Sequence, residues 1–195
     1  INEAVPEKSI TMVTYEGFKR LGFGDSVSDE LFTELVNVLG QSKEKTHRDK
    51  EIEYQKFHEM IGIGLKNTIA DVDVLGFDYA VIDEAHRCKN VFSQVKADDD
   101  GNKRYNIQSA TSETGQKAFL ILNFIQRKFG RNTMLLTATP FSNSPLEIYS
   151  MLSLVAYDSL RDNGIANLDT FFDLFVLPTV EWTANYKEEI VEKEV

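Results

Sequence analysis

The chain has 195 residues, of which 42% are hydrophobic and 27% charged, values that are ordinary for a globular protein with a buried core. No stretch approaches the roughly 20 apolar residues that a membrane-spanning helix requires, so the sequence excludes a membrane protein of that kind. The net charge of −10 argues against a free-standing nucleic-acid binder, because neutralising phosphates requires a basic surface, although a few local Lys and Arg residues could still contact DNA.

The single cysteine, Cys88, excludes an intrachain disulfide and a zinc site built from cysteines. We therefore expect a reducing, cytoplasmic setting. The chain begins with Ile1 rather than Met and shows no signal sequence, which leads us to expect an internal piece of a longer polypeptide.

The first predicted elements lie in the N-terminal third of the chain. A short apolar and β-branched run at Ile10–Tyr15 predicts a buried strand. Ser26 and Asp29 form a capping-box pattern ahead of an apolar stripe at 31–39. A longer polar helix is predicted at 45–66.

The next predicted strand, Phe77–Ile82, ends in two adjacent carboxylates, Asp83 and Glu84, which Ala85 and His86 follow. A carboxylate at the end of a buried strand can hold hydrated Mg²⁺, because this ion prefers carboxylate and water oxygens. A second carboxylate beside it can polarise an attacking water. For these four residues alone, a carboxylate pair that merely caps a helix is the alternative.

A polar segment at 98–104 predicts a hairpin tip or a mobile loop. Lys103 and Arg104 in this segment could contact nucleic acid, although a solvated loop explains them more simply.

Two further elements follow. An apolar stripe at 118–129 predicts a helix that Gly130 ends. The run Thr133–Thr137 predicts a third strand, and Thr139 adds a second hydroxyl just beyond its end. Taken alone, these hydroxyls are explained by a threonine-rich turn with ordinary hydrogen bonds.

The C-terminal part begins with a strong helix-start signal. Ser144, Pro145 and Glu147 occupy the N-cap, first and third positions of a predicted helix. The last ten or so residues are charged and predict a solvated helix or a frayed tail.

Strands that alternate with helices predict an α/β fold in which helices cover both faces of a parallel sheet. Such sheets bind ligands beyond the carboxyl ends of their strands. The predicted strand ends carry polar side chains, namely Thr14 and Tyr15, then Asp83, Glu84 and His86, then Thr137 and Thr139. We therefore expect these side chains to meet at one edge, the predicted active face.

Two segments resemble motifs of superfamily-two helicases and translocases. Asp83–His86 resembles motif II, and Leu136–Pro140 resembles motif III. Three further segments resemble the Snf-type branch of that superfamily, and they are Val13–Phe18, Arg87–Asn90 and Phe141–Tyr149. With Ala138 where chromatin remodellers usually carry Gly, the chain looks most like the helicase part of phage- or plasmid-borne DNA methyltransferase–helicase polypeptides.

The resemblance implies a partial RecA-like helicase ATP-binding domain over residues 1–180, from around motif Ib to past motif III. It would be a three-layer domain with a parallel sheet flanked by helices. A helical insertion would lie at about 26–67, and a charged C-terminal tail at 181–195.

The resemblance also implies roles for individual residues. Asp83 would bind Mg²⁺ through water, Glu84 would act as the catalytic base, and His86 would sense the γ-phosphate or the partner domain. Three residues would couple ATP hydrolysis to DNA engagement, and they are Thr137, Ala138 and Thr139. Nucleic-acid contacts would come from Thr14, Tyr15, Lys103 and Arg104.

Two parts of such an ATPase are missing from this sequence. A phosphate-binding loop needs Gly-Lys-Ser/Thr, and none of the 11 glycines is followed by Lys. The second RecA-like domain, with its arginine finger, is also missing. We therefore expect ATP, Mg²⁺ and DNA to act on the complete parent protein and the isolated chain to be inactive. Without the strand of the phosphate loop, an uncovered sheet edge could pair with another copy. A degenerate helicase-like scaffold without catalysis is the alternative function.

Overall fold

The computed structural model describes residues 3–23, 70–92, 111–142 and 144–177, together with the backbone of two strands at 180–184 and 190–194. Several predictions fall outside these residues, namely the helices at 31–39 and 45–66 and the loop at 98–104 with Lys103 and Arg104.

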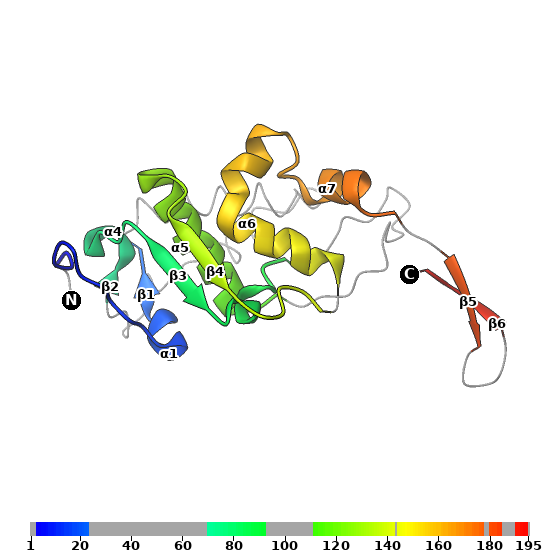
Figure 1. Ribbon diagram of the computed structural model, residues 1–195, viewed down its shortest axis with the longest axis horizontal. Helices are drawn as coiled ribbons and strands as arrows, with labels where there is room; N and C mark the ends of the chain where they lie inside the picture. The colour runs from blue at the N-terminus through cyan, green and yellow to red at the C-terminus, as the bar shows by residue number, and fades with distance from the viewer. Residues whose placement is uncertain are drawn as a thin grey trace, which may run out of the picture.

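Two short pairs of parallel strands lie beside the helices (Figure 1). One pair joins β1 (Leu21–Gly22) to β2 (Ala70–Asp71), and the other joins β3 (Ala80–Asp83) to β4 (Thr133–Leu136). The predicted strands around 77–82 and 133–137 are therefore confirmed as β3 and β4. The fold is α/β, with small parallel sheets flanked by helices, as the alternating pattern predicts.

The predicted strand at Ile10–Tyr15 is wrong. Residues 9–14 have no regular secondary structure, and Tyr15–Phe18 form the short helix α1. Ile10 and Met12 are 92% and 93% exposed. An apolar run indicates a tendency toward burial, but it does not show which strand it would pair with. Within the described part of the chain, no strand lies beside this segment.

The central helix α5 (Glu113–Phe129) carries much of the core. The Ser112 hydroxyl caps it by accepting a hydrogen bond from the Gly115 amide at 3.0 Å. Gly130 ends it with φ +84°, which confirms the predicted stop. The short helix α4 (Val72–Leu75), which follows β2 directly, adds two buried side chains.

A close backbone contact fixes α5 against the 3₁₀ turn η1 (Ala85–Cys88) that follows β3. A Cβ atom at Gly115 would lie 2.8 Å from the Asn90 carbonyl oxygen and 2.9 Å from that of Cys88. Both neighbours are backbone atoms, which cannot rotate away as a side chain would. Glycine is therefore required here by the close approach of two backbones.

The helix α6 (Pro145–Asp162) begins where the sequence predicts. Pro145 is its first residue, and the Ser144 hydroxyl accepts a hydrogen bond from the Leu146 amide at 3.1 Å. Its buried side chains pack on α5, and Tyr149 contributes a ring that contacts Phe92 and Phe171.

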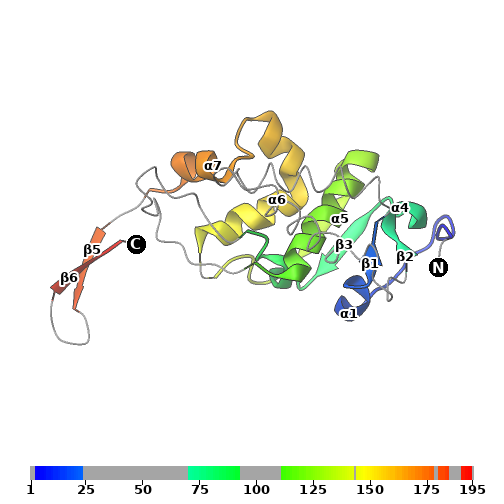
Figure 2. The ribbon, with the colours of Figure 1, turned by 180° about the vertical axis from the view of Figure 1, so that it is seen from behind.

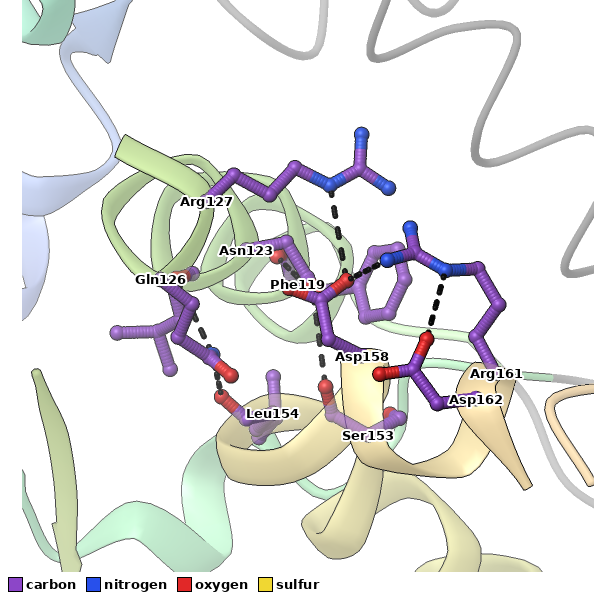
Figure 3. Close-up of polar contacts among 10 residues, drawn as sticks. Phe119, Asn123, Gln126, Arg127, Ser153, Leu154, Asp158, Arg161 and Asp162 are labelled. Atoms are coloured by element: carbon purple, nitrogen blue, oxygen red, sulfur yellow. Dashed lines mark hydrogen bonds and ion pairs between the residues drawn. The ribbon is translucent and has the colours of Figure 1, made fainter. Parts of the chain in front are cut away.

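A kink interrupts α6 at Ala156, whose backbone has φ −145° and ψ 29°. Two buried amides on α5 bond carbonyls just before the kink (Figure 3). Asn123 Nδ2 lies 3.5 Å from the Ser153 oxygen, and Gln126 Nε2 lies 2.8 Å from that of Leu154. A kink weakens the regular backbone hydrogen bonds of the helix around it. The two amides therefore donate hydrogen bonds to carbonyls that would otherwise lack a strong donor.

The chain ends differently from the prediction. The helix α7 (Leu168–Phe175), capped by Asn167, holds the clustered phenylalanines of the C-terminal segment. Beyond it, β5 (Val180–Ala184) and β6 (Ile190–Glu194) form an antiparallel hairpin, which lies apart from the helices in both views (Figures 1 and 2). The predicted solvated helix or frayed tail is therefore wrong for these residues.

Side chains of β3 and β4 alternate between a packed face and an exposed face. On the packed face, Ala80, Ile82 and Leu135 contact the core that α5 and α6 contribute. On the opposite face Val81 is 52% and Met134 45% exposed. The predicted covering of both faces is thus not found in the part of the chain that the structure describes. None of the helices among these residues is long and apolar enough to cross a membrane.

We predict that Gly115→Ala lowers the free energy of unfolding by about 1–3 kcal/mol, because the added methyl group forces two backbones apart. Urea unfolding followed by circular dichroism measures this. The neighbouring change Gln116→Ala, on the same helix, should cost less than about 0.5 kcal/mol. Equal stability of the Gly115→Ala variant and the wild type would contradict the close approach.

Candidate functional site

The polar residues that follow β3 and β4 meet at one edge of the sheet. The two strands run in parallel, with Asp83 opposite Leu136, so their carboxyl ends lie side by side (Figure 1). His86 Nδ1 lies 3.2 Å from Glu84 Oε2 and 3.4 Å from Thr137 Oγ1. The histidine therefore connects the carboxylate turn after β3 with the threonine turn after β4.

The carboxylate turn has a distinct backbone. Glu84 adopts a left-handed conformation, with φ 52° and ψ 44°, between β3 and η1. Its amide donates a hydrogen bond to Asp83 Oδ1 at 3.0 Å. This bond occupies one carboxylate oxygen of Asp83, which is an exposed residue at the end of β3.

His86 Nδ1 has two oxygen neighbours, Glu84 Oε2 and Thr137 Oγ1. Which group donates in the hydrogen bond between His86 and Thr137 depends on the tautomer of the ring. Thr137 Oγ1 also accepts a bond from the Thr139 amide at 3.2 Å, which closes the turn after β4. Ala138 and Thr139 are exposed at the tip of this turn.

Tyr15 reaches the same edge, as predicted, although it lies on a helix and not on a strand, and Thr14 precedes it as the cap of that helix. The Thr14 hydroxyl accepts a bond from the Gly17 amide at 3.1 Å and so caps α1. The Tyr15 hydroxyl lies 2.8 Å from the Asp83 carbonyl oxygen and 3.2 Å from that of Glu84. Three of the predicted groups of residues are therefore together.

Sequence reasoning missed a polar connection between η1 and the start of α6. Lys89 Nζ lies 3.0 Å from Glu147 Oε1 and 2.7 Å from the Ser142 hydroxyl. The Ser142 amide donates to Glu147 Oε2 at 2.7 Å. Lys89 and Glu147 lie in two different segments that resemble the Snf-type branch. Considering the two segments together could have predicted an ion pair between this lysine and this glutamate.

Glu147 marks the predicted helix start and also contacts residues outside the helix. The sequence places it at the third position of α6, where a glutamate often bonds the N-cap amide. Its side chain is instead buried and bonds Ser142 and Lys89, which lie outside the helix. It therefore fastens the segment after β4 to the segment after β3.

Burial changes the acidity of two side chains behind the carboxylate turn. It raises the pKa of the Cys88 thiol from 9.0 to about 11, and a hydrogen bond from Tyr15 partly offsets this. Burial also raises the pKa of Tyr15 from 10.0 to about 12. Both groups are therefore neutral at physiological pH, and Cys88 is no nucleophile.

The donors present suit Mg²⁺ better than a transition metal. Asp83 and Glu84 offer carboxylate oxygens at an exposed strand end. Among the described residues, no cluster of three or more His, Cys, Asp or Glu side chains could enclose an ion by itself. Mg²⁺ commonly binds through one or two carboxylates, with waters and substrate phosphates completing its shell.

No family model and no solved structure matches the chain. The chain is similar to "Defense against restriction protein B" of Escherichia phage P1, with 23% identity over 203 residues. The similarity covers 97% of this chain and 9% of the phage protein. The chain therefore corresponds to a small part of the length of that protein.

We predict that breaking the Lys89–Glu147 pair lowers the free energy of unfolding strongly, because one charge stays buried without its partner. Lys89→Met and Glu147→Gln should each cost about 3 kcal/mol, and the double variant clearly less than their sum. Urea unfolding of all four proteins measures this. The exposed pair Lys19–Glu16, at 3.3 Å, is the matched control, and its coupling should stay below about 1 kcal/mol. Strict additivity at Lys89 and Glu147 would rule out the pair.

The raised pKa of Cys88 predicts a loss of stability at alkaline pH. Its neutral form is favoured in the folded state, so the contribution is complete below pH 9 and is lost as pH rises through about 11. Tyr15 adds the same effect between pH 10 and about 12. Urea unfolding between pH 8 and 11 should show this decline, with a shallower slope for Cys88→Ser. An unchanged slope in that variant would contradict the assignment to Cys88.

Proposed function

We propose that the chain is part of the first RecA-like domain of a superfamily-two, DNA-dependent ATPase of the Snf-type branch. The parent protein would use ATP hydrolysis in the cytoplasm to translocate on DNA or to remodel it. The observation that carries the proposal is the contact of His86 Nδ1 with both Glu84 and Thr137. It joins two segments that independently resemble motifs II and III.

The named similarity gives further support. The phage protein that the chain resembles along 97% of its length is named for defence against restriction. An ATP-driven step on DNA suits a polypeptide with such a name, and a chain spanning 9% of it suits one domain among several.

In this proposal the carboxylates divide the work. Asp83 would hold Mg²⁺ through water, with its second oxygen fixed by the Glu84 amide. The bound ion would neutralise charge on the phosphates of ATP. Glu84 would accept a proton from the attacking water, and His86 would keep its carboxylate in place through the 3.2 Å contact.

The proposed coupling runs from the carboxylate turn to the threonine turn and to α6. A change at Glu84 reaches Thr137 through His86, which contacts both. The Lys89–Glu147 pair gives a second connection between the same two segments. Thr137, Ala138 and Thr139 would therefore respond to the state of the nucleotide and pass it to the DNA-engaging surface.

The alternative is a helicase-like scaffold that binds a protein or DNA without catalysis. The absence of a Gly-Lys-Ser/Thr loop upstream of this region in the parent protein would favour it, because no loop would then cradle the phosphates. The two proposals differ in whether the parent protein contains such a loop upstream of this region.

We predict that Glu84→Gln in the full-length protein lowers kcat for DNA-stimulated ATP hydrolysis by about 10²–10⁴-fold and leaves ATP binding intact. The amide keeps the shape of the side chain but cannot accept a proton. Phosphate release and nucleotide affinity measure the two effects. The exposed residue Glu7, changed to Gln, is the control and should retain full activity.

Normal turnover of Glu84→Gln would remove this residue from the base role. The complete absence of ATP hydrolysis in the wild-type full-length protein would favour the scaffold.

A further inference from the structure

The hydroxyl of Tyr15 reaches across the chain to the backbone of the carboxylate turn. It lies 2.8 Å from the Asp83 carbonyl oxygen and 3.2 Å from the Glu84 carbonyl oxygen, residues 68 and 69 positions away. One hydroxyl can serve two successive carbonyls only if both point the same way.

The conformation of Glu84 makes that alignment possible. In an extended strand successive carbonyls point to opposite sides, whereas helical dihedral angles make them nearly parallel. Glu84 has φ 52° and ψ 44°, a left-handed helical pair of angles, directly after the last residue of β3. The hydroxyl thus contacts two carbonyls whose alignment this conformation creates, and it favours the conformation in return.

Tyr15 is itself held firmly enough to perform this role. The Arg87 guanidinium carbon lies 5.1 Å from the centre of its ring, and Thr14 caps the helix that carries it. The buried ammonium of Lys117 on α5 donates hydrogen bonds to the carbonyls of Lys19 and Leu21, just after α1. These contacts fix α1 relative to the core and to the carboxylate turn.

We infer that Tyr15 is a positioning residue, whose hydroxyl holds Glu84 in its left-handed conformation and so aims the Glu84 carboxylate. The inference rests on the proposed function for its effect on catalysis, but its effect on the turn does not depend on that function. It also gives Tyr15 a role within the chain that differs from the nucleic-acid contact predicted from sequence.

The test removes the hydroxyl and keeps the ring. Tyr15→Phe in the full-length protein should raise the amide hydrogen-exchange rates of residues 84–88 by about 10-fold, while exchange in α5 stays unchanged. If the protein hydrolyses ATP, kcat should fall about 10-fold with an unchanged KM for ATP, because the nucleotide still binds beside a misaligned base.

Tyr79→Phe is the matched control. This tyrosine lies just before β3, is 52% exposed, and loses the same atom. It should leave both exchange and kcat at wild-type values.

Three outcomes would overturn the inference. They are unchanged exchange at residues 84–88, faster exchange throughout the core with a lowered urea midpoint, and a rise in KM without a fall in kcat. The first two are read without any hydrolysis, so they remain decisive even if Glu84→Gln shows that Glu84 is not the base.

Discussion

The backbone of β3 pairs in parallel with that of β4, with Asp83 opposite Leu136, and the polar contacts of the candidate site depend on this register. Because side chains alternate along a strand, a shift of β4 by one residue would turn Leu135 out of the core. It would also carry Thr137 away from His86. The hydrophobic packing of one face therefore determines which polar groups meet at the strand ends.

Buried polar side chains then join segments that are far apart in sequence. Lys117 binds carbonyls after α1, Lys89 binds Glu147 at the start of α6, and Gln126 binds the Leu154 carbonyl before the kink. Burial lowers the pKa of Lys117, since the ammonium gives up water for two carbonyl oxygens. Such groups tolerate little movement, because a displaced buried donor or acceptor has no water to replace its partner. The segments around the site are thus held in one arrangement.

The sequence predicted those features whose signals are local. The α5 stripe with its Gly130 stop, the Ser144-Pro145 helix start and the two central strands were all found close to their predicted positions. The sequence also predicted that Tyr15 lies near the carboxylate turn, but it placed Tyr15 at the end of a strand and not in the helix α1. What failed depended on distant partners. Whether the apolar run at Ile10–Tyr15 pairs with another strand is decided by three-dimensional neighbours that periodicity does not report. The contact between Glu147 and Lys89, which was not predicted, also depends on such neighbours.

The left-handed backbone of Glu84 creates a conflict between stability and chemistry at a single position. Conformation alone would favour glycine or asparagine there, because a longer side chain in this region costs about 1 kcal/mol or more. The base role proposed for Glu84 would require a carboxylate at that point in space. Selection for stability alone would replace this glutamate. A more stable chain and a catalytically active one would therefore differ at this residue. Such a trade-off is characteristic of residues retained for what they do and not for how well they fold.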